Sequence, residues 1–198
     1  TFALPGMKST NVAGFTAKKM IPQGMCTAGA YILISAYDKN GDDESVIYVM
    51  SRSSKSYITT IVLPNKTKAG GIAYDSKNKN IWISNGKAVS YIPYDTISKA
   101  VTTGDSYTEV AEYSGTYTVP LTASYIGYYN GMLWVGAFHE NKTSNAYGYQ
   151  IGSVDGKPSL TYKNTMSMPS RTRAITFDSE GYLYLTRSSR TKLSMSGY

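Results

Sequence analysis

Residues 70–84 read GGIAYDSKNKNIWIS and contain the clearest structural pattern of the chain. Two apolar segments flank a polar turn there, as in a hairpin of two β-strands. The same strand–turn–strand pattern occurs three more times. The other copies are residues 23–35 (QGMCTAGAYILIS), residues 123–136 (ASYIGYYNGMLWVG) and residues 174–186 (AITFDSEGYLYLT). Four copies of one pattern in a single chain predict a repeat architecture.

A proline ends a short β-like segment upstream of each copy. These prolines are Pro5, Pro64, Pro120 and Pro169, at intervals of about 50 residues. Because proline has no N–H to donate to a strand ladder, we expect each one to mark the point where a strand leaves its sheet.

Each copy continues into further strands. The expected third strands are residues 45–50, 88–94, 146–151 and 192–195, and residues 57–63 form an expected fourth strand. Four antiparallel strands per unit of about 50 residues predict the blades of a β-propeller. The last copy reaches Tyr198 without a fourth strand, whereas Phe2-Ala3-Leu4 has no copy before it. We therefore expect four blades in a ring that the N-terminal strand closes.

Composition agrees with a single all-β domain over residues 1–198. Tyrosine, which favours strands, occurs 19 times against 4 Phe and 2 Trp. The only helix-like stretch, residues 95–101, is too short to be stable alone. Two alternatives remain: a five-bladed propeller in a longer chain, and a β-sandwich or barrel.

Charge and residue counts exclude several classes of site. The net charge is +7, but no run of five basic residues occurs, which favours a solvated basic surface over nucleic-acid binding. The single Cys26 excludes an internal disulfide and a cysteine zinc cluster, and the single His139 excludes a multi-histidine metal site. No apolar stretch reaches the 18 residues or so of a membrane span. We expect Cys26 to be a small buried hydrophobic residue.

Several of these segments resemble a known group of proteins. Residues 22–26, 69–73 and 133–138, with the strand-ending prolines, resemble secreted bacterial β-propellers of uncharacterised function and, more distantly, gluconolactonase-like and NHL-type propellers. The resemblance implies a propeller fold and an extracellular or cell-surface location. The lactonase relatives hold a divalent metal at the channel through Glu, Asn and Asp ligands, and no comparable acidic set stands at matching positions here.

In a propeller, ligands meet one face of the channel, where the innermost strands begin and neighbouring loops converge. The candidate ligand-binding residues at such positions are Gln23, Tyr37, Asn85, His139, Glu140, Arg173 and Arg187. His139 with Glu140 is the most reactive-looking pair. Arginines at 171, 173, 187 and 190 could receive a carboxylate, sulfate or phosphate if they converge. Residues 38–44 have the oxygen-rich alternation of a calcium loop, but they also contain an Asn-Gly turn.

No catalytic or cofactor motif is present in the sequence. We expect a non-catalytic extracellular binding or scaffold protein that recognises a glycan, peptide or protein through one face of the propeller and needs no cofactor. The alternative is a hydrolase or lactonase that holds a divalent metal such as calcium at the central channel.

Overall fold

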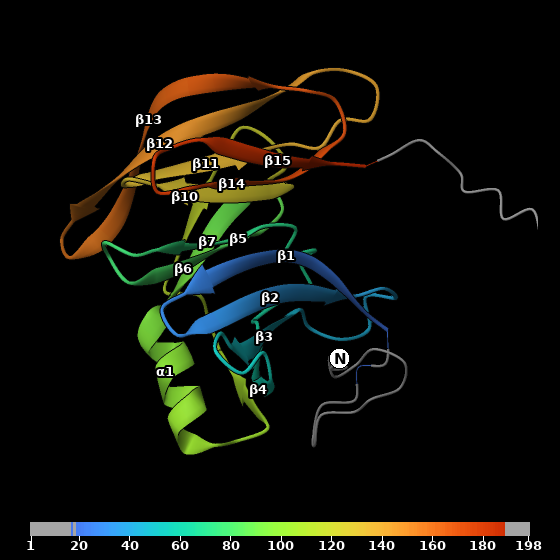
Figure 1. The fold of residues 1–198 in the computed structure, drawn as a ribbon, viewed down its shortest axis with the longest axis vertical. Helices are drawn as coiled ribbons and strands as arrows, with labels where there is room; N and C mark the ends of the chain where they lie inside the picture. Colours follow the sequence, from blue (N-terminus) through green and yellow to red (C-terminus); the bar gives the residue numbers. More distant parts are fainter. Residues whose placement is uncertain (1–16, 18, 189–198) are drawn as a thin grey trace, which may run out of the picture.

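A computed structural model describes residue 17 and residues 19–188 as a series of antiparallel sheets with one helix (Figure 1). The first sheet contains β1 (Met20–Ala28), β2 (Tyr31–Asp38), β3 (Val46–Ser51) and β4 (Tyr57–Val62), joined by β8 (Tyr107–Glu109). The second contains β5 (Ile72–Asp75), β6 (Asn80–Ser84), β7 (Ala88–Pro93) and β9 (Gly115–Thr118). The third contains β10 (Tyr125–Tyr129), β11 (Met132–Gly136), β12 (Ser144–Val154) and β13 (Lys157–Met168). The fourth contains β14 (Thr172–Phe177) and β15 (Leu183–Arg187).

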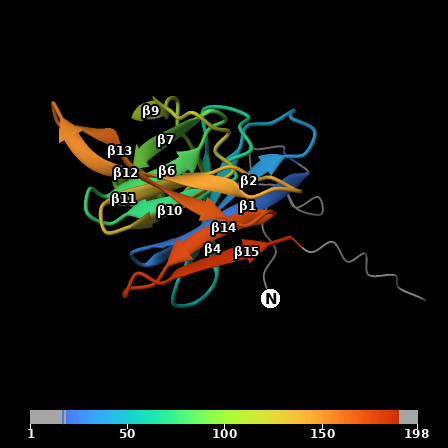
Figure 2. The same ribbon diagram turned by 90° about the horizontal axis from the view of Figure 1, so that it is seen from above.

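The arrangement of the sheets is propeller-like. Within each sheet the antiparallel strands lie side by side in chain order, as the sequence repeats predict. The first strands of successive sheets pack against one another, β1 on β5, β5 on β10 and β10 on β14. Figure 2 shows β1, β10 and β14 close together, whereas β9 and β13 lie toward the edge of the molecule. The predicted all-β class is thereby confirmed.

The hairpin turns follow from local sequence. Asn130 and Gly131 join β10 to β11 with φ angles of 46° and 77°, the left-handed values that a tight two-residue turn requires. The prolines also lie where they were predicted. Pro64, Pro120 and Pro169 each lie within two residues after the fourth strand of a sheet, namely β4, β9 and β13. Pro5, residues 2–4 and residues 192–195 lie outside the described residues.

Apolar side chains fill the spaces between successive sheets. Leu33, Ile47 and Ile61 of the first sheet form one buried cluster with Ile72 and Ile81 of the second. The opposite face of the second sheet contributes Trp82 and Val89 to a cluster that contains Ile126, Leu133 and Val135 of the third. Ile175 of the fourth sheet packs with Tyr125 of the third. Because the second sheet is covered on both faces, every residue of β6 is buried.

One pair of sheets approaches unusually closely. A Cβ atom placed on Gly71 would lie 2.3 Å from the backbone nitrogen of Ile126, and one on Gly70 would lie 2.4 Å from the carbonyl oxygen of Ser124. Only glycine permits this contact between the start of β5 and the start of β10. The Gly70-Gly71 pair in the repeat is therefore a packing requirement.

Residues 94–109 differ from the repeat pattern. The helix-like stretch forms α1 (Tyr94–Thr103), which packs on β4 and β7 and buries Ile97 and Ala100. This packing supplies the stability that a ten-residue helix lacks in isolation. Gly104, with a φ of 73°, ends the helix, and the chain then adds β8 as a parallel partner of β4. No repeat signal predicts this fifth strand, which covers the edge of the first sheet.

Candidate functional site

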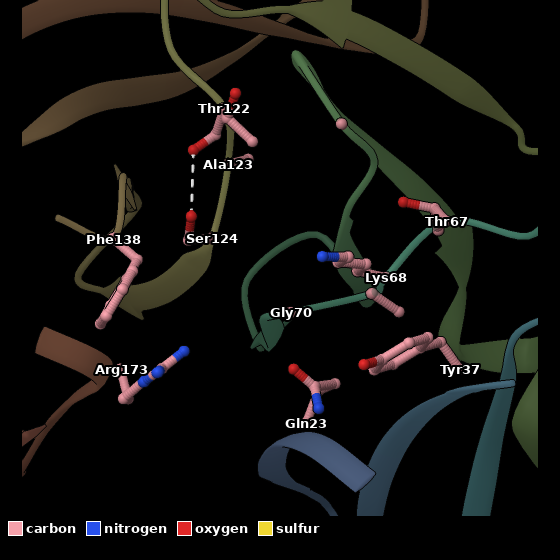
Figure 3. A pocket seen from close by; sticks show the side chains of 12 residues that line it. Gln23, Tyr37, Thr67, Lys68, Gly70, Thr122, Ala123, Ser124, Phe138 and Arg173 are labelled. Atoms are coloured by element: carbon pink, nitrogen blue, oxygen red, sulfur yellow. Dashed lines mark hydrogen bonds between the residues drawn. The ribbon is translucent and has the colours of Figure 1, made fainter. Parts of the chain in front are cut away.

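A cavity of about 440 Å³ lies where the first strands of all four sheets begin (Figure 3). We call it the four-sheet cavity. Its lining residues are Gln23, Tyr37, Thr67, Lys68, Ala69, Gly70, Gly86, Thr122, Ala123, Ser124, Phe138 and Arg173. Its volume falls within the range of small-molecule sites, roughly 300 to 1,000 Å³.

The lining follows the sequence repeat. The first two strands of each sheet pair at equivalent positions, namely Met25 with Ile34, Ile72 with Ile83, Ile126 with Val135, and Ile175 with Leu185. The first residue of each pair lies on the first strand of its sheet. The residues two positions before it are, in the four sheets, Gln23, Gly70, Ser124 and Arg173. All four line the cavity.

A second set of repeat positions meets the first set. The second residue of each pair lies on the second strand of its sheet. The residues three positions after it are, in the four sheets, Tyr37, Gly86, Phe138 and Ser188. The first three of these line the cavity, and Ser188 accepts a hydrogen bond of 3.4 Å from Nε of Arg173. Each sheet thus contributes to this region through the same pair of repeat positions.

Buried hydrogen bonds hold the cavity's wall between the first and second sheets. The hydroxyl of Ser35 donates to the carbonyl oxygen of Ala69 at 2.7 Å and accepts from the backbone N–H of Gly24 at 3.1 Å. Ser35 is fully buried, and Ala69 has a left-handed φ of 45°. Because Ala69 is fixed in this way, its neighbours Lys68 and Gly70 face the cavity from a constrained segment.

The charged groups of the lining are all cationic. Lys68 and Arg173 line the cavity, whereas no aspartate, glutamate or histidine of the described residues does. The guanidinium carbon of Arg173 lies 3.8 Å from the centre of the Phe138 ring, a stacked cation–π contact. In Figure 3 the Arg173 guanidinium points into the cavity, opposite Gln23 and Tyr37. The cavity therefore offers positive charge without a carboxylate in its described lining to neutralise it.

Four residues that the sequence proposed as ligand-binding lie outside this lining. Asn85 braces a loop, because its Nδ2 donates to Ser90 Oγ at 2.9 Å and its Oδ1 accepts from Asn65 Nδ2 at 3.1 Å. The carbonyl of His139 accepts the backbone N–H of Arg171 at 2.7 Å, and Glu140 is exposed.

Arg187, the fourth of these residues, donates from Nε to the carbonyl of Ser170 at 2.9 Å. The structure thus brings Gln23, Tyr37 and Arg173 together at one cavity and places Asn85, His139, Glu140 and Arg187 around it. Of the four arginines considered in the sequence, Arg173 lines the cavity, and Arg190 lies outside the described residues.

Sequence reasoning missed Lys68 and Phe138. A signal for Phe138 was available, since it occupies the repeat position of Tyr37. Lys68 precedes the Ala69-Gly70-Gly71 segment and has no counterpart in the other repeats that the pattern would have highlighted.

A second hollow of about 350 Å³ is lined by the other ends of the same first strands. Met25 projects there with 69% of its side chain exposed, and Cys26 lies beside it. Burial raises the pKa of the Cys26 thiol to about 12. Cys26 is half-buried, and desolvation keeps its thiol protonated at neutral pH, unlike the thiolate of a reactive cysteine.

Among the described residues, the side chains do not form the acidic set that a lactonase-type metal would need. Within the part of the chain that the structure describes, no three His, Cys, Asp or Glu side chains group so that they could hold a metal ion. The acidic residues of the β2–β3 turn bond within the turn, where Asp38 Oδ2 accepts the N–H of Asp42 at 2.9 Å and Asn40 Nδ2 donates to Asp42 Oδ2 at 3.2 Å. Burial, and then Asp38, raise the pKa of the nearby Asp43 carboxyl.

The chain matches no known family model. No curated protein matches it either. Similar solved structures include Kuenenia stuttgartiensis hydrazine synthase, with 12% identity, a TM-score of 0.45, and coverage of 84% of this chain and 55% of that one. The WD40 domain of SCAP from fission yeast has 14% identity, a TM-score of 0.40, and coverage of 85% and 44%. The chain thus spans about half the length of these structures.

No helix in the described residues is long and apolar enough to cross a membrane.

Proposed function

We propose that this chain is a non-catalytic binding protein that recognises its ligand, a glycan or peptide or a protein segment, at the four-sheet cavity. The observation that carries the proposal is the convergence of equivalent repeat positions from all four sheets on one cavity. A site built from several sheets is positioned by the packed core between them, which favours rigid and specific recognition.

The chemistry of the lining supports binding over catalysis. The cavity contains an amide, hydroxyl groups, two aromatic rings and two cations. General acid–base catalysis most often uses His, Glu or Asp, and the described lining contains none of these. His139 and Glu140 lie near the cavity in sequence but outside its lining.

The proposal includes a four-bladed propeller fold. It also includes an extracellular or cell-surface location for the protein. The fourth sheet has two strands in the described residues, and Tyr182 and Tyr184 near its outer strand are 65% and 57% exposed. Strands from residues 192–195 and 2–4 would complete this sheet and close the ring. If so, Leu4→Ser lowers the melting temperature, whereas Thr161→Ser, at an exposed position of β13, leaves it unchanged. Equal melting temperatures for the two variants would contradict closure by this segment.

An array experiment tests the binding proposal. The purified chain is applied to glycan and peptide arrays beside two variants, Thr122→Trp and Thr161→Trp. Thr122 lines the cavity, so the indole should obstruct the site, whereas Thr161 is an exposed residue of β13. We expect ligands retained by the unmodified chain to be lost with Thr122→Trp and kept with Thr161→Trp. Absence of any retained ligand, or equal retention by both variants, would refute the proposal.

Detection of the protein on intact cells or in culture medium of its source tests the location. Recovery only from the intracellular fraction would contradict it.

A further inference from the structure

The four-sheet cavity contains two cations that no acidic group of the described chain neutralises. Lys68 and Arg173 both line it. The one ion pair found among residues 17 and 19–188 joins Lys99 to Asp95 on the exposed face of α1. A cavity with two cations and no carboxylate concentrates positive potential, because its low-dielectric walls focus the field.

The contacts of Arg173 leave the outer edge of its guanidinium available to a ligand. Its guanidinium lies against the Phe138 ring, and its Nε donates weakly to Ser188 Oγ, with 3.4 Å between the two atoms. Both contacts orient the plane of the group. The two terminal nitrogens have no protein partner in the described part of the chain, and Figure 3 shows the group directed into the cavity. This is the fork geometry with which arginine binds a carboxylate or a phosphate through two parallel hydrogen bonds.

Neutral polar groups lie across the cavity from this fork. Gln23 and the Tyr37 hydroxyl point toward the centre from the first sheet, whereas the Ser124 hydroxyl donates to the carbonyl of Thr122 at 3.3 Å (Figure 3). These neutral groups can hydrogen-bond the hydroxyl groups of a small polar ligand, whereas they would not neutralise a second charged group on it.

From this arrangement we infer that the four-sheet cavity binds a small polar ligand through an anionic group, a carboxylate or a phosphate, held between Arg173 and Lys68. The inference rests on the proposed function, since it names the chemistry of the ligand at the same site. Arg173 supplies the oriented fork, and Lys68 supplies a second positive charge.

Three probes that share one sugar ring test this inference. Glucuronate carries a carboxylate, glucose 6-phosphate carries a phosphate, and glucose carries neither. Calorimetric titration at low ionic strength, in a buffer free of sulfate and phosphate, measures the affinity of each. We expect at least one of the anions to bind about tenfold or more tightly than glucose, the effect expected for charge-assisted hydrogen bonds. The anion that binds identifies the group.

Variants separate the site from general surface charge. Arg173→Gln and Lys68→Gln should each weaken the anion about tenfold, whereas Lys163→Gln, at an exposed position of β13, removes the same charge and should leave the affinity unchanged. Arg173→Lys should fall between Arg173→Gln and the unmodified chain, because it keeps the charge and loses the fork. Far-UV circular dichroism and melting temperature confirm that each variant is folded.

Three results would overturn the inference: no binding of either anion at 50 mM or so, equal affinity for glucose, or unchanged anion binding by Arg173→Gln. Its failure is distinguishable from failure of the proposed function. Array ligands that Thr122→Trp abolishes while Arg173→Gln leaves intact would refute the anionic chemistry alone. Anion binding that depends on Arg173 without any array ligand would refute recognition of glycans, peptides and proteins alone.

Discussion

Replacement of Gly71 by alanine tests whether the second and third sheets meet as closely as the structure indicates. The new methyl carbon would lie 2.3 Å from the Ile126 nitrogen and 2.9 Å from the carbonyl carbon of Tyr125. These are backbone atoms of a buried strand, so they cannot rotate away as a side chain would. The start of β10 must therefore move, and overpacking of this kind costs about 2–3 kcal/mol.

Urea unfolding and thermal melting measure that cost. For a domain of this size, a loss of about 2–3 kcal/mol lowers the melting temperature by roughly 5–10 °C. Gly152→Ala is the matched control, because its nearest neighbour is the Ser159 hydroxyl, which can turn aside. We expect the control to cost less than about 1 kcal/mol. Stability of Gly71→Ala within about 0.5 kcal/mol of the unmodified chain, or an equal loss in both variants, would refute the close approach of the two sheets.

Changes and reactions at three further residues test other parts of the structure. Trp82→Ala should cost about 3–5 kcal/mol in urea unfolding, because the indole is fully buried against Tyr91 and Tyr117; a loss below about 1 kcal/mol would contradict this packing. Ser35→Ala should cost about 1–3 kcal/mol, since it leaves the carbonyl of Ala69 and the N–H of Gly24 without their buried partner, and a neutral result would show that the cavity wall is held otherwise. Burial raises the pKa of Cys26 from 9.0 to about 12, so the native thiol should react with iodoacetamide at pH 8 much more slowly than the urea-unfolded chain. The same shift makes the Cys26 contribution to stability complete below pH 9 and lost as the pH rises toward 12, so Cys26→Ala should flatten the alkaline part of the stability profile, and identical profiles would contradict the burial.

The repeat could be recognised from sequence because hairpin chemistry is local. Asn130-Gly131 specifies a tight turn by itself, and the prolines after β4, β9 and β13 exclude continued pairing without reference to the rest of the chain. The order of strands in each sheet followed from these signals. By contrast, β8 has three residues and exists because α1 returns the chain to the edge of β4, which is a tertiary effect.

The sequence predicted the region in which the cavity lies, but only some of the residues that line it. The sequence directed attention to the first-strand starts and second-strand ends, and three of its candidates, Gln23, Tyr37 and Arg173, line the cavity there. Asn85 comes one position before the repeat position that Gly86 occupies, and its side chain instead bonds Ser90 and Asn65. His139 likewise comes one position after Phe138. Along extended chain, a shift of one residue reverses the direction of the side chain, so an approximate alignment of repeats could not separate these neighbours.

If the four sheets form one binding site, a single ligand contacts all of them at the four-sheet cavity. Heteronuclear NMR tests it directly, by titrating the isotope-labelled chain with a ligand retained on the arrays and following backbone amide signals. We predict that the amides of Gln23, Gly70, Ser124 and Arg173 shift together along one saturation curve, while those of the distant hairpin residues Gly131 and Gly156 stay in place. Shifts confined to a single sheet, or centred on the exposed tyrosines beside β15, would contradict it.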